Sequence, residues 1–195
     1  MKTDYQLTSE RLLLRPYKNA DLLDLLDAIH HSQQSLSPWL PWCHAQYSQH
    51  DAHEWIHASQ QNWVYDISYE FAIFERSTEA FLGSTSLSNL SELANSAELG
   101  YWIRSSAQRQ GYAKEACQAI AQFAFETVGL TRIEIVTHTG NLASQRTALA
   151  TKARFECTAR NRIITQAGPI DGLLFSLIPS DIARHLPPPD LSPNN

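Results

Sequence analysis

The chain has 195 residues, of which 43% are hydrophobic and 18% charged, so it is long and apolar enough for one globular domain with a sizeable core. A formal net charge of −5 and the lack of a long basic run argue against a nucleic acid as the main partner. The sequence has neither an apolar run of the roughly 18 residues that span a membrane nor a signal-peptide segment, and its three widely spaced cysteines fit reduced thiols, so we expect a cytoplasmic protein with no membrane partner.

The N-terminal segment predicts a strand and then a helix. Residues 11–15 are mostly apolar and stop at Pro16, which is typical of a strand. Asn19 or Asp21 can cap a helix with an apolar face, and we expect that helix to end at residues 30–32.

Residues 36–42 contain two prolines and two tryptophans. Two prolines within four residues exclude an ordinary helix or a central strand, so we predict an irregular loop. Trp39 and Trp42 place large apolar side chains on this loop, where they either plug the core or line a ligand cleft.

Residues 50–64 have helical spacing and contain a His-Glu-x-x-His pattern at His53, Glu54 and His57. In zinc peptidases the two histidines of this pattern bind the metal and the glutamate activates the bound water. The glycine and third histidine of the extended pattern are missing from the sequence. We therefore favour a solvated histidine-rich helix face and predict no metal site, which leaves a zinc peptidase as a remote alternative.

The middle of the chain predicts a β-hairpin formed by residues 70–75 and 81–87. Residues 88–96 are polar and predict a loop. This loop leads into the segment that carries the strongest functional signal.

That segment predicts a strand over residues 98–103, a polar turn, and a long helix from Ala113 to Val128 that Gly129 closes in a left-handed conformation. The first N–H groups of a helix lack internal partners, and the helix dipole places partial positive charge there. Gly111 allows close approach to the backbone and Arg109 adds a charge, so the turn suits a phosphate or pyrophosphate. Gly111 alone is a weak signal, because it could simply ease a strand-to-helix turn.

The rest of the chain predicts four more elements: a strand over 131–137, a helix from 142 to about 152, and strands over 155–164 and 173–178. Together the elements predict an α/β (α+β) fold with a mixed central sheet of about seven strands and helices on both faces. We expect a single domain over residues 1–182 and a loose proline-rich tail over 183–195.

Four segments occur in an order that matches a known family. The loop pattern Arg/Gln-x-x-Gly-x-Gly/Ala stands here as Gln108-Arg109-Gln110-Gly111-Tyr112-Ala113, with the strand 98–103 before it, Asn141-Leu142-Ala143-Ser144 after it, and the aromatic loop 36–42 upstream. On these segments the chain resembles the Gcn5-related N-acetyltransferase (GNAT) superfamily. Within it, the chain is most similar to the ribosomal-protein N-terminal acetyltransferases that modify a Ser or Ala α-amine, and the resemblance covers nearly all of residues 12–180.

The resemblance implies a GNAT fold in which acetyl-CoA binds between two splayed strands, 98–103 and 131–137. Backbone N–H groups of the loop would hold the pyrophosphate, Asn141 would bind the pantetheine arm, and a backbone N–H of the first strand would polarise the acetyl carbonyl. The implied cofactor-binding residues are Tyr101, Trp102, Ile103, Gln108, Arg109, Gln110, Gly111, Tyr112, Ala113, Asn141 and Ser144. Trp39 and Trp42 would line the acceptor cleft, and no metal is expected.

The chemistry favours an α-amine as acceptor, because only a neutral amine attacks a thioester. A free α-amine has a pKa of about 7.7–8.0, whereas the pKa of a lysine side chain is about 10.4. Deprotonating the lysine is therefore harder by about 2.5 pKa units, or roughly 3.5 kcal/mol. A modest base therefore suffices, and Glu98 is our candidate, with an ion pair to an arginine as the alternative. Ser144 could protonate the departing thiolate or could merely cap its helix, and Asn141 could likewise be only an N-cap.

The sequence also departs from this branch. The Gly-Phe that usually ends the last helix is missing, and no carboxylate occurs from Cys157 to Ala167, where some relatives carry a proposed base. The leading hypothesis is an acetyl-CoA-dependent N-acetyltransferase acting on a protein N-terminus. A small-molecule amine acceptor stays open, as does a non-catalytic acyl-CoA sensor that would keep Gly111 and Asn141 without needing Glu98 or Ser144. A homodimer stays open too.

Overall fold

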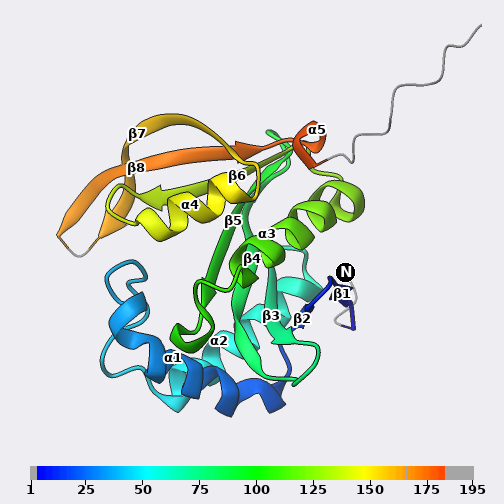
Figure 1. The fold of residues 1–195 in the computed structure, drawn as a ribbon, viewed down its shortest axis with the longest axis vertical. Coiled ribbons are helices and arrows are strands. Elements are labelled where there is room, and N and C mark those ends of the chain that lie inside the picture. Colours follow the sequence, from blue (N-terminus) through cyan, green and yellow to red (C-terminus); the bar gives the residue numbers. More distant parts are fainter. Residues whose placement is uncertain (1–3, 166, 183–195) are drawn as a thin grey trace, which may run out of the picture.

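A computed structural model of the chain describes residues 4–165 and 167–182, and all eight strands lie in one sheet in the order β1-β2-β3-β4-β5-β6-β8-β7 (Figure 1). The strands are Leu7–Thr8 (β1), Leu12–Pro16 (β2), Tyr69–Glu75 (β3), Phe81–Ser91 (β4), Ser96–Ile103 (β5), Arg132–His138 (β6), Arg154–Thr165 (β7) and Gly168–Leu177 (β8). Neighbouring strands pair antiparallel except β5 and β6, which run parallel. The predicted mixed sheet is confirmed with eight strands rather than about seven, because the two-residue β1 is too short to show in a pattern.

The helices cover both faces of the sheet, as predicted. They are Leu22–Leu36 (α1), Gln49–Val64 (α2), Tyr112–Phe123 (α3), Leu142–Ala150 (α4) and Pro179–Ile182 (α5). One core packs α1 and α2 against the sheet, and a larger core packs α3 and α4 against the opposite face. In β3 both faces are buried, since Phe71 and Ile73 belong to the larger core while Ala72 and Phe74 belong to the smaller one.

The helix α3 lies close to the sheet because small residues form its inner face. Ala116, Cys117 and Ala121 are fully buried there. A π-helical turn at Ala124–Val128 follows, and Gly129 then ends the segment with φ = 81°, the left-handed conformation that the sequence predicts.

Two predicted boundaries are wrong. The helix expected to end at residues 30–32 continues to Leu36, because Ser32 is buried and its hydroxyl accepts a hydrogen bond from the Ser105 N–H (2.9 Å). The polar segment 88–96 is mostly strand rather than loop, because Ser91 pairs across the sheet with Ser96 and leaves only a four-residue connection. In both places a tertiary contact satisfies polar residues that the sequence pattern assigns to a break.

The C-terminal hairpin of β7 and β8 is longer than predicted and forms one end of the sheet. The predicted tail over 183–195 lies outside the described residues. Within the ranges 4–165 and 167–182, no helix is both long and apolar enough to cross a membrane.

A glycine on β4 fixes the approach of β5. Gly83 has φ = 153°, and a Cβ placed on it would lie 2.1 Å from the Trp102 carbonyl oxygen. We expect Gly83→Ala to lower the free energy of unfolding by about 2–3 kcal/mol, because backbone atoms would have to move. Gly129→Ala is the matched control, since a Cβ there meets nothing within 4 Å and adds only backbone strain of about 1 kcal/mol. Urea unfolding curves measure both, and equal losses would contradict the steric argument.

Candidate active site

The parallel pair β5 and β6 separates part-way along its length. Pairing is limited to Ser96–Glu98 against Arg132–Glu134, although β5 continues to Ile103 and β6 to His138. Beyond that point, backbone groups of β5 that face β6 have no strand partner. A cavity of about 1610 Å³ lies there, lined by both strands, α4, the N-terminus of α3, the loop after α1 and the tip of the β7–β8 hairpin.

The loop at the N-terminus of α3 forms one wall of the cavity. Arg109 has φ = 61° and Gly111 has φ = 83°, so two left-handed residues flank Gln110. Alternation of this kind turns successive N–H groups toward one side and creates an anion-binding concavity. No side chain caps α3, so its first N–H groups add to this concavity.

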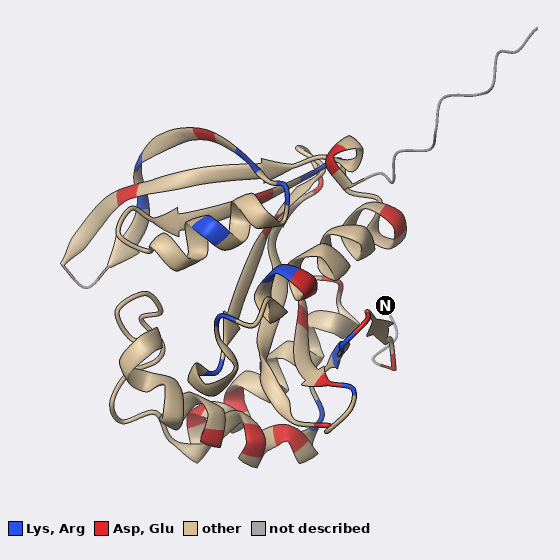
Figure 2. Ribbon diagram, viewed as in Figure 1, with Lys and Arg blue, Asp and Glu red and all other residues tan. Residues whose placement is uncertain are grey.

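The charges around the cavity are unevenly distributed. Arg109, Lys114 and Arg146 line it near the start of α3 and along α4. Residues 19–75, in contrast, contain eight Asp or Glu and no Lys or Arg, and Figure 2 shows acidic positions along α1 and α2. The side of the cavity near the start of α3 is therefore basic, whereas the helices on the opposite face of the sheet are acidic.

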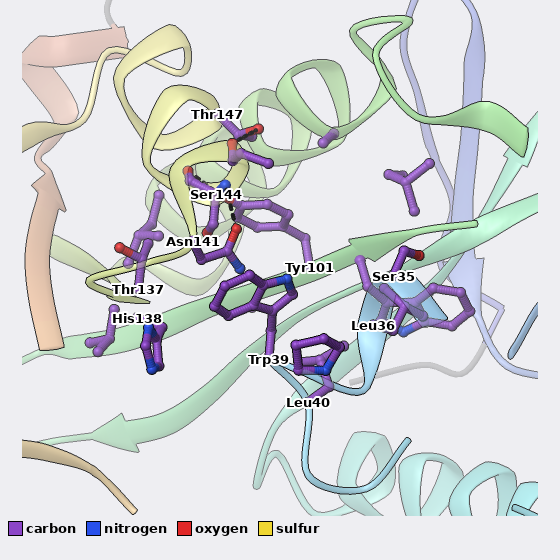
Figure 3. A pocket seen from close by; sticks show the side chains of 18 of the residues that line it. Ser35, Leu36, Trp39, Leu40, Tyr101, Thr137, His138, Asn141, Ser144 and Thr147 are labelled. Carbon is purple, nitrogen blue, oxygen red and sulfur yellow. Dashed lines mark hydrogen bonds between the residues drawn. The ribbon is translucent and has the colours of Figure 1, made fainter. Parts of the chain in front are cut away.

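A hydroxyl pair lies at the start of α4 (Figure 3). The Tyr101 hydroxyl donates to the Ser144 carbonyl (3.0 Å) and lies 3.0 Å from Ser144 Oγ. Burial raises the pKa of Tyr101, so the phenol keeps its proton. The hydroxyl of Ser144 thus contacts another side chain rather than capping the helix. The cap is Asn141, whose Oδ1 accepts a hydrogen bond from the Ser144 N–H (3.1 Å).

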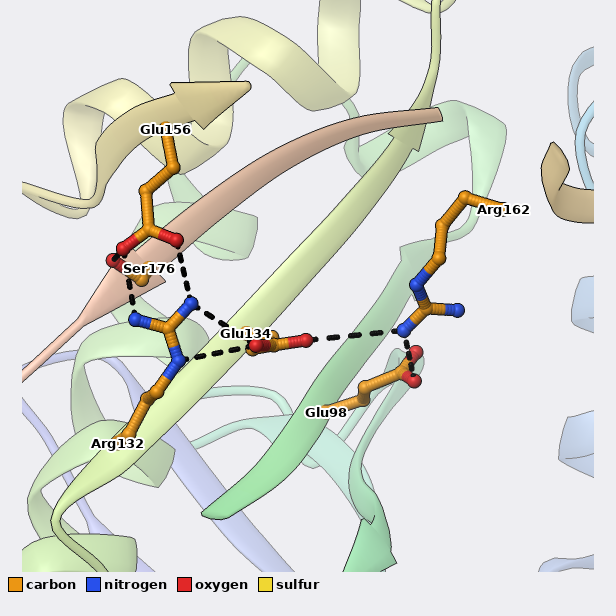
Figure 4. A network of polar contacts seen from close by, with 6 residues as sticks. All are labelled: Glu98, Arg132, Glu134, Glu156, Arg162 and Ser176. Atoms are coloured by element: carbon orange, nitrogen blue, oxygen red, sulfur yellow. Dashed lines mark hydrogen bonds and ion pairs between the residues drawn. The ribbon is translucent and has the colours of Figure 1, made fainter. Parts of the chain in front are cut away.

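Glu98 lies at the point where the strands part, and it is ion-paired (Figure 4). Its Oε1 accepts hydrogen bonds from Arg162 Nη2 (2.5 Å) and Asn89 Nδ2 (3.0 Å). Among the described residues no hydrogen bond reaches Oε2. The ion pair that the sequence leaves as an alternative for Glu98 is therefore present, and the other carboxylate oxygen stays available on the cavity wall.

The ion pairs continue away from the cavity across the sheet. Glu134 on β6 lies between Arg162 (3.8 Å) and Arg132 (3.0 Å), and Arg132 also binds Glu156 (2.6 Å). This chain of charges links β5, β6 and β7, with a further hydrogen bond from the Ser176 hydroxyl on β8 to Glu156 (2.6 Å) (Figure 4).

The two tryptophans of the 36–42 loop have different surroundings. Trp39 lines the cavity, and its ring centroid lies 5.3 Å from that of His138. Trp42 packs on Trp102 and Tyr47, each at 6.0 Å, and is not among the cavity-lining residues.

The structure brings most of the predicted site residues to this one cavity. Its lining includes Trp39, Glu98, Tyr101, Trp102, Ile103, Gln108, Arg109, Gly111, Tyr112, Ala113, Asn141 and Ser144, whereas Gln110 and Trp42 are outside it. His53 and Glu54 are exposed on α2, and in the described part of the chain no three metal-ligating side chains form a group.

Sequence reasoning missed several lining residues. His138 ends β6, and its Nδ1 accepts a hydrogen bond from the Gly140 N–H (2.9 Å). Its position three residues before Asn141 would have indicated it. Lys114 could have been found from its place in the first turn of α3. Arg162 could not, because an irregularity in β7 between Ala159 and Ile163 sets its direction.

Comparison with known proteins identifies the family. The acetyltransferase (GNAT) domain matches residues 11–155. The chain belongs to the GNAT acetyltransferase family. This confirms the resemblance drawn from the loop pattern and the segments around it, and it confirms the fold class.

Individual GNAT relatives are similar over different shares of their length. A provisionally assigned ribosomal-protein-serine acetyltransferase from Vibrio cholerae is 38% identical, with a TM-score of 0.81, over 92% of this chain and 100% of that one. RimJ of Mycobacterium smegmatis, solved in complex with CoA-disulfide, is 20% identical, with a TM-score of 0.82, over 93% of this chain and 90% of the RimJ chain. This likeness shows a shared fold. The uncharacterised N-acetyltransferase YoaA of Bacillus subtilis is 29% identical over 108 residues, which are 55% of this chain and only 61% of YoaA.

The ion-pair network predicts a pH dependence of stability. Hydrogen bonds from Arg132 and then Ser176 lower the pKa of Glu156 to about 2. The folded state thus favours the carboxylate, and this stabilisation is complete above the unfolded pKa of about 4.3 and is lost as the pH falls toward 2. The side chain is 37% exposed, so screening limits the effect, and we expect Glu156→Gln to cost less than about 1 kcal/mol at pH 7.

Urea unfolding at pH 7 and at steps from pH 4.5 to 2 tests this. The difference between wild type and Glu156→Gln should shrink to nothing by the lowest pH. Glu92→Gln is the control, since Glu92 is exposed and has no ion pair among the described residues. A pH-independent difference at position 156 would contradict the linkage.

Proposed function

We propose that this GNAT protein transfers an acetyl group from acetyl-CoA to a primary amine, with the N-terminal α-amine of a protein as acceptor. The observation that carries the proposal is the separation of β5 and β6 directly beside an uncapped helix N-terminus. A long, thin substrate with a diphosphate near one end and a thioester at the other fits both features at once. The CoA-disulfide in the RimJ complex supports this substrate class.

The loop suits the diphosphate by geometry and charge. The left-handed residues Arg109 and Gly111 expose N–H groups, and the side chains of Arg109 and Lys114 add positive charge. Gly111 has no side chain, and a Cβ built there would have Arg11 Nη2 at 3.4 Å as its nearest atom outside the neighbouring residues.

The unpaired part of β5 suits the pantetheine arm and the thioester. Backbone groups of residues 99–103 that lack a β6 partner can bond the amides of the arm, and one N–H can polarise the acetyl carbonyl. The amine nitrogen then bonds to the acetyl carbon as the C–S bond breaks. The departing thiolate takes a proton from the Ser144 hydroxyl, which is held beside Tyr101. The extra proton that the acylated nitrogen then loses restores the Ser144 hydroxyl.

On the acceptor side, Glu98 takes the proton that the acceptor ammonium loses before it attacks as a neutral amine, directly or through a water. Arg162 and Asn89 bind one of its oxygens, so the carboxylate is held in place and its second oxygen is available. A carboxylate is a modest base. An α-amine requires no more than that, because its pKa of about 7.7–8.0 leaves a usable neutral fraction.

Two observations favour a protein N-terminus over a small amine. The Vibrio cholerae protein, provisionally assigned to ribosomal-protein serine acetylation, is similar over the whole of its chain. The acidic residues of α1 and α2 also favour a cationic acceptor by long-range attraction.

An acceptor screen tests the proposal. Thiol release from acetyl-CoA would be measured with Ser- and Ala-starting peptides carrying either basic or acidic residues at positions two to six, beside the same peptides with blocked N-termini and a polyamine panel. We expect turnover with free Ser or Ala termini and higher kcat/KM for the basic set. Turnover with polyamines alone would show that the acceptor is a small amine. CoA binding with no turnover on any amine would favour a non-catalytic acyl-CoA sensor.

Gly111→Glu tests the diphosphate assignment. The substitution places a carboxylate against the phosphates, so we expect CoA binding to be lost, as measured by calorimetry. Gly111→Ala is the control, because it introduces the same strain at φ = 83° without a charge, and it should weaken binding far less. CoA affinity of Gly111→Glu within twofold of wild type would remove the assignment.

Ser144→Ala tests the leaving-group role. We expect kcat to fall about 10²-fold or more while the affinity for CoA changes little, because proton donation matters as the C–S bond breaks. Leu149→Ala, a half-exposed position on the same helix, should keep the wild-type rate. A near-normal kcat for Ser144→Ala would leave the hydroxyl with only its contact to Tyr101.

A further inference from the structure

Arg11 contacts the loop before α3 without being one of the residues that line the cavity. Its Nη1 donates to the Gln110 carbonyl (2.9 Å), and its Nε donates to Glu115 Oε2 (2.7 Å). The guanidinium also lies over the Tyr112 ring, 4.5 Å from the centroid. Arg11 does not line the cavity, whereas Gly111 and Tyr112 do.

The contact with Gln110 fixes the direction of the next N–H group. In a planar trans peptide the carbonyl and the N–H of the following residue point opposite ways. Arg11 holds the Gln110 carbonyl on its own side, so the N–H of Gly111, which lines the cavity, points away from Arg11. Arg109 and Gly111 are both left-handed, a strained arrangement in Arg109, and a firm contact at Gln110 between them keeps that arrangement in place.

Arg11 also pairs with an acidic residue in the first turn of α3. Glu115 lies in the first turn of α3, where its charge would repel a diphosphate. Its oxygens accept hydrogen bonds from the Ser9 hydroxyl (2.7 Å), the Arg11 N–H (2.8 Å) and the guanidinium. Burial raises the pKa of Glu115, but these bonds outweigh burial and leave the pKa below its usual value. Glu115 is therefore ionised, and it is paired with Arg11.

We propose that Arg11 is a positioning residue for diphosphate binding, which aims the Gly111 N–H into the cavity and pairs with Glu115 so that its charge does not oppose the ligand. The inference rests on the proposed acetyl-CoA site and adds a residue outside the cavity to it. It places a requirement for CoA affinity on the residue just before β2, a strand that is separated from β5 by β3 and β4 in the sheet.

Arg11→Met removes both effects. We expect the Kd for CoA, measured by calorimetry, to rise about 10-fold, the usual scale for losing one charge-assisted hydrogen bond, with kcat at saturating acetyl-CoA within about twofold of wild type. Arg11→Met combined with Glu115→Gln should recover part of this loss, because the exposed charge is removed while the freed Gln110 carbonyl remains. The Kd of Arg11→Lys should lie between those of wild type and Arg11→Met, since lysine keeps the positive charge but lacks the planar guanidinium that bonds two groups at once.

Arg76→Met is the matched control. Arg76 holds the same N-terminal segment, donating to the Ser9 carbonyl (2.9 Å) and the Glu10 carbonyl (3.3 Å), but none of its hydrogen bonds reaches the loop. Its Kd for CoA should stay within about twofold of wild type.

S-acetylpantetheine separates positioning from general damage, because it carries the thioester without the diphosphate. We expect wild type and Arg11→Met to have equal kcat/KM with this substrate, within about twofold, while they differ about 10-fold with acetyl-CoA. An equal loss with both substrates, or an unchanged Kd for CoA, would overturn the role of Arg11. Failure of the wild type itself to bind CoA would instead overturn the proposed function, and this inference with it.

Discussion

The separation of β5 and β6 beyond Glu98 and Glu134 is the feature on which the candidate site depends. A parallel pair inside a sheet normally satisfies its backbone groups by pairing along its whole length. Here β5 keeps a full partner in β4 on one side and loses β6 on the other, so it stays rigid while exposing a row of hydrogen-bonding groups. A ligand can bond this row without any local unfolding, and the row lies next to an uncapped helix end that attracts negative charge.

The ion pairs explain how the sheet holds together where the strands part. The Arg162 side chain extends from β7 to Glu98 on β5. Gly172 on β8 leaves space for Arg162, because a Cβ on residue 172 would lie 3.2 Å from Arg162 Cβ. The hairpin is thus joined to β5 by a side chain where backbone pairing between β5 and β6 has ended. The same contact orients Glu98 on the cavity wall.

The sequence predicts the parts of the site that local chemistry dictates. The left-handed backbone at residue 111 favours glycine, and Asn141 caps a helix. Both features can be predicted from a short stretch of residues. The element order and the mixed sheet follow from hydrophobic spacing in the same way. Arg162 could not be predicted, because an irregular strand aims it across two neighbours, and the position of Trp42 off the cavity wall depends on packing against Trp102, 60 residues further along the chain.

The anion-binding loop shows why such a site needs support from distant segments. Its conformation includes a left-handed arginine, which an isolated loop would leave for a relaxed backbone. An acidic residue in the first turn favours the helix itself, through the dipole, but opposes a phosphate at the same place. Arg11, just before β2, contacts both features, since its guanidinium donates to the Gln110 carbonyl and pairs with Glu115. The helix therefore keeps its stabilising carboxylate while its N-terminus remains positively polarised toward the cavity.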